Sequence, residues 1–387
     1  MNNLSGVIVD ETRKKPNQRV IGGLILIFLV ILVCVVVALR NSNGASNKDA
    51  TQIYGAVGGG KENLLDDEQF KSILIERYGI NVVNDSWSNG KLVVNPVVRE
   101  NGDGYDFIFF SDQRFYDYYK LAADPTKGEA ERERVLKGNL TLNTPIVIYS
   151  WDTVVDALIN ENIVTLKDGV YYITDMDKLL QYILEGKTWK EIGVENLYGK
   201  ININSTDPVT SSPGATYYGL LLSILCGGEV TEANIEQNLP KLKEFYEKSG
   251  YMNNTPADLF DIYLKTGVGA QPMIVDYEKS IIDFANSNPD GYAQVKDKMR
   301  ILYPVPTIWN SHCIATLTED GNKYYEAFND QEIQQLAWSK YGFRTGITGG
   351  SYDVTKVGVT GIPQTIDTTV SGLRINIYNR LIEYLSE

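Results

Sequence analysis

The sequence contains little of what metal and redox chemistry requires. His312 is the only histidine in 387 residues, and the cysteines are Cys34, Cys226 and Cys313. A single imidazole excludes any site built on two or more histidines, so we expect no zinc chemistry, no metal and no cofactor. The sequence leaves open whether Cys226 and Cys313 form a disulfide or remain buried free thiols.

Basic residues are also in short supply. The chain has 36 Lys and Arg against 49 Asp and Glu, which gives a net charge of −13 at pH 7. The first 40 residues are net basic, so the negative charge belongs to the part that follows them. Such a surface argues against nucleic acid as a partner. It does not exclude a small anion, because backbone amides and helix ends create local positive sites.

One long hydrophobic run stands out at residues 20–39, which carry no charge. About 20 such residues in a helix cover the roughly 30 Å of a bilayer core. Basic residues gather before the run, and only Arg40 follows it directly. The positive-inside rule then predicts a cytoplasmic tail at 1–19, a transmembrane anchor at 20–39 and an extracellular remainder. A cleaved signal peptide is the alternative, although its apolar core is usually shorter, about 7–15 residues.

Residues 40–50 are polar and predict a flexible tether, whereas 51–387 predict a folded domain. Apolar strand patterns alternate with helical ones, which predicts an α/β fold with mainly parallel sheets. Residues 123–143 are rich in charge and suggest a surface insertion. The local predictions are a strand at 53–57, a helix ending at Gly79, a strand at 80–83, a hairpin at 163–173, a helix between Asp175 and Gly186, a strand at 201–203, a helix at 215–226, a helix between Thr255 and Gly267, and closing helices at 323–341 and 370–385.

Three loops each follow a predicted strand and are candidates for ligand contact. The segment 206–217 opens a helix with small hydroxyl residues, so the positive end of the helix dipole and its first amides favour an anion. The turn 58–60 and the segment 111–113 have similar positions. The alternatives are an ordinary helix cap at 206–217 and a merely tight glycine turn at 58–60.

Seven segments, in order, resemble the extracellular solute-binding proteins of type II topology, the receptors that feed ABC importers. The resemblance covers nearly all of residues 52–387. The matching segments are Ile53–Gly60, Ser88–Leu92, Asp106–Ser111, Lys187–Ile192, Thr206–Gly214, Gln271–Glu278 and Tyr303–Pro304.

The resemblance implies two α/β lobes joined by two crossing strands, with the ligand in the cleft and hinge closure around it. Lobe one would comprise 51–147 and 305–387, and lobe two 148–304. It also implies a small-molecule ligand, an oxyanion in our preferred interpretation, and an ABC permease or another membrane protein as partner. The implied ligand-binding residues are Gly59, Gly60, Ser88, Ser111, Thr206, Ser211, Ser212, Gly214, Thr216, Tyr217, Tyr277 and Glu278.

Other roles for some of these residues stay open. Tyr277 can instead pack between lobes, Glu278 can support the loops, and Ser88 can be a turn residue. At the level of the whole chain, the alternative is a membrane-anchored sensor or scaffold that uses a binding-protein fold for protein interaction or signalling. An enzyme is not expected, because no acid/base pair, nucleophile elbow or metal motif is recognisable.

Overall fold

The computed structural model describes residues 50–88, 92–93, 98–122, 135–250, 252, 255–346 and 352–387. The chain divides into two compact units, Met1–Ala50 and Thr51–Glu387, and the second contains every element described below. A search of the described helices finds none with the length and apolar character of a membrane span. The predicted anchor at 20–39 lies outside the described residues, as does the tail before it.

The strands follow one another in hydrogen-bonded order β2-β1-β3-β9-β4-β8-β6-β5. The short β10 and β7 pair with β4, and β11 pairs with β9. Their bounds are β1 (Thr51–Gly58), β2 (Ile80–Trp87), β3 (Phe107–Phe110), β4 (Lys137–Trp151), β5 (Val164–Lys167), β6 (Val170–Ile173), β7 (Met273–Tyr277), β8 (Met299–Pro304), β9 (Thr307–Thr316), β10 (Arg344–Thr345) and β11 (Thr369–Val370).

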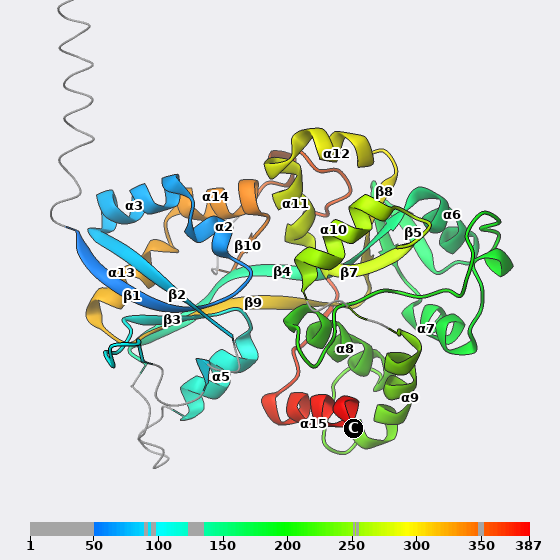
Figure 1. The fold of residues 1–387 in the computed structure, drawn as a ribbon, viewed down its shortest axis with the longest axis horizontal. Helices are drawn as coiled ribbons and strands as arrows, with labels where there is room; N and C mark the ends of the chain where they lie inside the picture. The colour runs from blue at the N-terminus through cyan, green and yellow to red at the C-terminus, as the bar shows by residue number, and fades with distance from the viewer. Residues whose placement is uncertain are drawn as a thin grey trace, which may run out of the picture. The chain divides into compact units, whose positions relative to one another are not determined.

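The strand β4 belongs to both halves of this arrangement (Figure 1). Its first part, up to Pro145, pairs with β9, and its second part, from Ile146, pairs with β7 and β8. The chain returns from β8 to β9 through the Val305-Pro306 peptide bond, which is cis. We name the half with β1, β2, β3, β9 and β10 lobe one, and the half with β5 to β8 lobe two. The predicted boundaries, 147/148 and 304/305, fall within a few residues of these changes of partner.

The prediction of mainly parallel sheets is wrong, because the sheet is mixed. Parallel pairing joins β1 to β2 and β3, β6 to β8, and β11 to β9. Antiparallel pairing joins β4 to β7, β8, β9 and β10, and β9 to β3. The cause is topological: β4 and β9 cross between the lobes in opposite directions, so they pair antiparallel with each other, and β3, β7, β8 and β10 run antiparallel to the crossing strand they join.

Helices cover both faces of each half. Lobe one carries α2, α3, α13 and α14 on one face and α5 on the other, whereas α6 to α12 belong to lobe two (Figure 1). The helices are α2 (Glu62–Leu65), α3 (Glu68–Tyr78), α5 (Gln113–Ala122), α6 (Asp152–Asn160), α7 (Met176–Glu185), α8 (Ser212–Leu225), α9 (Ile235–Lys248), α10 (Pro256–Thr266), α11 (Glu278–Ser287), α12 (Pro289–Val295), α13 (Glu319–Ala327), α14 (Gln331–Tyr341) and α15 (Ile375–Ser386), with 3-10 turns at Lys190–Ile192 and Val354–Lys356.

Several local predictions are confirmed at the level of individual caps. Gly79 ends α3 with φ of 64°, a left-handed conformation that glycine adopts without strain. Asp175 caps α7 by accepting a hydrogen bond from the Lys178 amide at 2.9 Å. Thr255 caps α10 in the same way, with Pro256 in its first turn. The hairpin at 163–173 is present as β5 and β6.

Other local predictions are wrong. Residues 201–203 form no strand, although the next residue, Asn204, bridges to Ile274 of β7. The expected helix at 323–341 is interrupted after Ala327, and the expected helix at 370–385 begins only at Ile375. Part of the presumed insertion at 123–143 is strand β4, while 123–134 lie outside the described residues.

The position of α15 also differs from the sequence prediction, which assigned it to lobe one. Its apolar residues Ile377, Leu381 and Leu385 join the buried core of lobe two, where α15 contacts α9. The helix additionally touches α5 of lobe one. A polar contact reinforces the docking, because Lys243 donates to the Leu385 carbonyl oxygen at 2.9 Å. Amphipathic periodicity predicted this helix but carried no information about which lobe it covers.

Candidate functional site

A cavity of about 750 Å³ lies between the two lobes. Its lobe-one wall includes the turn after β1 and the start of α2, the residues that follow β2 and β3, part of β9, and the end of α14 with the residues after it. Its lobe-two wall consists of the start of α8, one side of α10, and the connection from β7 into α11. Pockets that bury drug-sized ligands measure about 300–1,000 Å³, so the cavity is large enough for an organic molecule.

A larger hollow of about 850 Å³ lies beside β2, and lobe-one residues alone line it. Closure of the lobes would not enclose a ligand there. The interlobe cavity instead collects groups from the carboxyl ends of β1, β3 and β7, where α/β sheets usually bind ligands. For this reason we take the interlobe cavity as the candidate site.

The structure places a majority of the predicted site residues in the wall of this cavity. Those residues are Gly59, Gly60, Ser88, Ser111, Ser211, Ser212 and Tyr277. They come from five separate segments, and sequence order alone did not require these segments to converge. Their roles in binding remain predictions.

The remaining predicted residues lie outside the cavity wall. Thr206 is buried behind the start of α8, and its hydroxyl accepts a hydrogen bond from the Ser211 hydroxyl at 2.8 Å. Gly214 packs against the same segment, where a Cβ atom would lie 2.2 Å from the Thr206 carbonyl oxygen. Both residues therefore shape the loop from behind.

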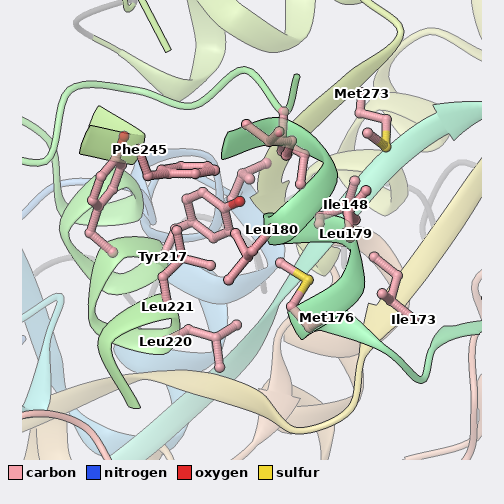
Figure 2. Close-up of a cluster of buried hydrophobic side chains, with 14 of the residues drawn as sticks. Ile148, Ile173, Met176, Leu179, Leu180, Tyr217, Leu220, Leu221, Phe245 and Met273 are labelled. Carbon is pink, nitrogen blue, oxygen red and sulfur yellow. The ribbon is translucent and has the colours of Figure 1, made fainter. Parts of the chain in front are cut away.

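Thr216 and Tyr217 belong to the body of α8. Thr216 is buried and borders a separate cavity of about 640 Å³ next to α5. Tyr217 is fully buried in the lobe-two core, together with Leu180 and Phe245 (Figure 2). Neither side chain faces the interlobe cavity in this structure.

Glu278 is also absent from the cavity wall and forms a buried ion pair. Its carboxylate accepts hydrogen bonds from Arg344 Nε and Nη2 at 2.6 and 2.7 Å, and from the Tyr303 hydroxyl at 2.6 Å. Burial disfavours the charged form of Arg344, but Glu278 more than offsets this and raises the Arg344 pKa. The pair connects α11 of lobe two to β10 of lobe one.

The amides of the 206–211 loop are less available than the sequence suggested. Those of Val209, Thr210 and Ser211 donate to the side chain or carbonyl oxygen of Asp207, at 2.8–3.2 Å. Pro213, in the first turn of α8, has no amide proton. The attraction of this segment for an anion therefore depends on the start of α8 and its dipole.

The glycine turn after β1 already holds a carboxylate. The Gly60 amide donates to both carboxylate oxygens of Glu62, at 3.0 and 2.8 Å. The amide that sequence reasoning assigned to a ligand anion is thus occupied by an anion from the chain itself. A ligand that binds this amide would have to displace Glu62.

Sequence reasoning missed Lys61, which lines the cavity and is only 1% exposed. Its Nζ donates to the Gly58 carbonyl oxygen and, at 3.0 Å, to the Ser111 hydroxyl. It also lies 4.6 Å from the centre of the Phe109 ring. Burial lowers the pKa of the Lys61 ammonium to about 7; Glu62 opposes the shift and Lys279 adds to it. Lysines are rarely buried without a partner, so composition gave no signal for it.

Lobe two contributes a second lysine, Lys279, and a buried carboxyl, Asp276. The Lys279 ammonium lies 5.2 Å from the centre of the Phe343 ring. Burial raises the pKa of Asp276 to about 6, although the Tyr277 amide, the Ser280 hydroxyl and Lys279 each favour its charged form. Each lobe therefore contributes charged side chains to the cavity wall.

The acidic residues nearer the rim have partners of their own. Asp283 accepts a hydrogen bond from Asn63 of lobe one at 2.9 Å, and Asp261 pairs with Lys265 one helical turn away. In contrast, the ion pairs found among the described residues include neither Lys61 nor Lys279. The carboxyl groups of Glu62, Asp276 and Asp283 line the cavity as well, and their hydrogen bonds come from neutral donors, so the wall carries charge of both signs.

The only histidine, His312, also lies in the cavity wall. Its Nε2 is 3.1 Å from Asn310 Nδ2, and the ring packs edge-to-face against Phe343. Burial, Lys61 and Lys279 together place its pKa well below the ordinary value, so the ring is neutral at pH 7. It contributes shape and polarity to the lobe-one wall, not positive charge.

Grouped metal ligands are absent from the part of the chain that the structure describes. Cys226 and Cys313, which the sequence left open, are free thiols. Cys313 is buried in β9, and burial raises the pKa of its thiol, which makes it a poor nucleophile.

Comparison with family models gives no match, and neither does comparison with curated protein sequences. Solved structures do match. A Bordetella parapertussis protein described as an extracellular solute-binding protein is 14% identical, with a TM-score of 0.54 over 88% of this chain and 97% of the other. The ferric binding protein from Campylobacter jejuni is 13% identical, with a TM-score of 0.54 over 86% and 97%. An ABC-transporter substrate binding protein from Agrobacterium tumefaciens is 13% identical, with a TM-score of 0.50 over 88% and 95%.

These likenesses establish the fold. The described chain has the two-lobed α/β architecture of type II periplasmic binding proteins, as the resemblance of its segments implied. At 13–14% identity, the ligands of these structures carry no information about this cavity.

Proposed function

We propose that this chain, which has the fold of the solute-binding proteins, captures a small anionic ligand in the interlobe cavity and delivers it for ABC-type uptake. The observation that supports this proposal most strongly is the cavity, because residues of both lobes line it. Its wall contains Lys61 and Lys279, neither of which has an ion-pair partner among the described residues. Buried charge is normally paired, so a charged ligand is the natural counter-ion.

Closure of the lobes would complete the site. The walls already touch at the rim, where Asn63 donates to Asp283 and Asn286 donates to the Ser339 and Lys340 carbonyl oxygens at 3.0 Å. Apolar packing also crosses between the lobes here, because Trp338 of α14 lies in one buried cluster with Ile281 and Ile282 of α11. A ligand that contacts both walls would add to these contacts and favour the closed state by its differential affinity.

We propose further that the ligand leaves unchanged. The acidic side chains near the rim are held by Asn63, Lys265 and the Gly60 amide, and the Cys313 thiol is buried. No pair of these groups is arranged as nucleophile and base. Turnover of a bound compound would contradict this part of the proposal.

Delivery at a membrane is supported by the uncharged run at 20–39 and its basic flank. We propose that this run anchors the folded domain on the outer face, within reach of a permease. Protease added to intact cells should then digest residues beyond 50. Protection of that part would reverse the proposed orientation.

A ligand screen on the full-length chain tests the function directly. A compound that binds only the folded state stabilises it by RT ln(1 + [L]/Kd), about 2.7 kcal/mol at a hundredfold excess over Kd. The panel should contain molybdate, tungstate, phosphate, sulfate, carboxylates, amino acids and sugars, read as shifts in melting temperature. We expect a clear shift from at least one anion. A panel that shifts nothing would contradict solute binding.

A further inference from the structure

The interlobe cavity places two lysine ammonium groups on opposite lobes. Lys61 follows the β1 turn of lobe one, and Lys279 lies in the first turn of α11 in lobe two. The two charges are close enough that Lys279 lowers the Lys61 pKa. Like charges that face each other across a closing cleft oppose closure, unless an anion lies between them.

Lys61 in particular lacks a counter-charge. It is 1% exposed, and its ammonium donates to two neutral oxygens, the Gly58 carbonyl and the Ser111 hydroxyl. The nearest acidic residue, Glu62, is exposed and directs its carboxylate to the Gly60 amide. A buried ammonium without a carboxylate is costly, and the pKa of about 7 reflects that cost.

The other groups around this position do not neutralise it. His312 of β9 is a neutral ring, and Cys313 is a protonated thiol at neutral pH. Asp276 of β7 and Asp283 of α11 line the same cavity, but the charged groups that shift the Lys61 pKa are Glu62, Lys279 and Cys313. Asp276 receives hydrogen bonds from the Tyr277 amide and the Ser280 hydroxyl, and Lys279 attracts its charged form.

The lobe-two wall also has an apolar part. Ala257, Phe260 and Leu264 of α10 and Phe284 of α11 line it, opposite Phe343 of lobe one. An inorganic oxyanion would fill only a small part of about 750 Å³ and leave these surfaces wet. An organic body would bury them, at a gain of roughly 25 cal/mol per Å² of apolar surface removed from water.

We propose that the ligand is an organic anion whose compact negative head lies between Lys61 and Lys279 and whose apolar body packs on Phe260 and Phe284. This inference rests on the proposed function and narrows its ligand class. The head neutralises one ammonium from each lobe, and this bridging is what makes closure favourable. Binding restores the proton on Lys61, so capture takes up a proton near neutral pH.

Calorimetry on the full-length chain tests this with probes whose own charge is constant above pH 6. The probes are phenyl sulfate and benzoate, their counterparts sulfate and acetate that lack the aromatic body, and neutral phenyl glucoside. We expect at least one aromatic anion to bind, and to bind at least about tenfold more tightly than its counterpart.

The pH dependence has a defined sign. With a free-state pKa of about 7, Lys61 is mostly charged at pH 6.0 and mostly neutral at pH 8.5. Affinity for the aromatic anion should therefore fall by about 30-fold between these two values. Titrations in buffers of different ionisation enthalpy should show proton uptake at pH 7.5.

Variants separate charge from shape. Lys61→Met should lower the affinity for the aromatic anion at least about tenfold at pH 6.0 and abolish proton uptake. Lys61→Arg should bind the anion without the pH dependence, because arginine stays charged. Lys279→Met should weaken binding about threefold or more. Lys167→Met, an exposed lysine of β5 outside the cavity, is the matched control and should bind like the wild type.

The outcomes distinguish this inference from the function beneath it. Binding of phenyl glucoside without binding of any anion, or anion binding that is indifferent to Lys61→Met, would overturn the inference and leave solute binding intact. Tighter binding of sulfate or acetate than of the aromatic anions would contradict the inference that the ligand has an apolar organic body. If no compound in this set or in the wider screen binds, the organic-anion inference and the proposed solute-binding function are both contradicted.

Discussion

Glu278→Ala should lower the free energy of unfolding by about 3–5 kcal/mol. The substitution leaves the Arg344 guanidinium, which is 1% exposed, without the carboxylate that accepts two of its hydrogen bonds. It also removes the acceptor of the buried Tyr303 hydroxyl. Arg344 keeps the Tyr352 hydroxyl and the Pro363 carbonyl oxygen, but neither carries a compensating charge. Urea denaturation at pH 7 measures the loss.

Glu236→Ala is the matched control, because Glu236 also forms a two-bond ion pair with an arginine, Arg380, at 2.8 and 3.0 Å. That pair joins α9 and α15 at the surface, where water replaces the lost partner, so we expect only a small change. Equal effects from the two substitutions would contradict the account of Glu278. They would mean that the buried arginine relaxes to solvent when its partner is removed.

The contrast between these two pairs bears on Glu278, which the sequence analysis named as a candidate for ligand contact and also as a possible support for the loops. Its place directly after Tyr277 at the end of a predicted strand is the position of a binding residue. Its role depends on Arg344, 66 residues later, and on Tyr303. Long-range pairing of this kind is not encoded in local pattern. The sequence analysis had left a supporting role open, and the structure favours it.

Helix ends, in contrast, could be predicted from the sequence wherever a single capping residue determines the local backbone conformation. Gly79, Asp175 and Thr255 act at helix ends within a few residues of the atoms they satisfy, and their prediction needs no tertiary information. The mixed sheet was missed because the direction of β4 and β9 follows from their passage between lobes. An apolar run such as 145–149 looks the same in either direction.

Lys61 is a residue whose position was known from the sequence but whose role was not predicted. It directly follows the Gly58–Gly60 turn in the sequence, but the sequence analysis considered that turn only as a ligand-contacting loop or a tight glycine turn. Burial turned an ordinary lysine into the most unusual group of the cavity, and burial is a property of the assembled lobes. The sequence thus predicted where the candidate loops lie along the chain, but it did not predict which charged groups surround them in the folded protein.

Gly214→Ala should cost about 3 kcal/mol of unfolding free energy, the upper end of the usual cost of overpacking. The new methyl group would lie 2.2 Å from the Thr206 carbonyl oxygen and 2.9 Å from the Asp207 carbonyl carbon. Both are backbone atoms, so no rotamer change can relieve the overlap. The 206–211 loop must therefore move away from the start of α8.

That movement should also reduce ligand affinity, because Ser211 and Ser212 lie in the cavity wall beside the displaced loop. Gly269→Ala is the control, since a Cβ at Gly269 meets no atom within 4 Å. We expect Gly214→Ala to lower both the melting temperature and the affinity for whichever compound the screen finds, and Gly269→Ala to change neither. A destabilised Gly214→Ala protein that keeps full affinity would show that the α8 start is a helix cap only, and would leave the lysine pair as the source of anion binding.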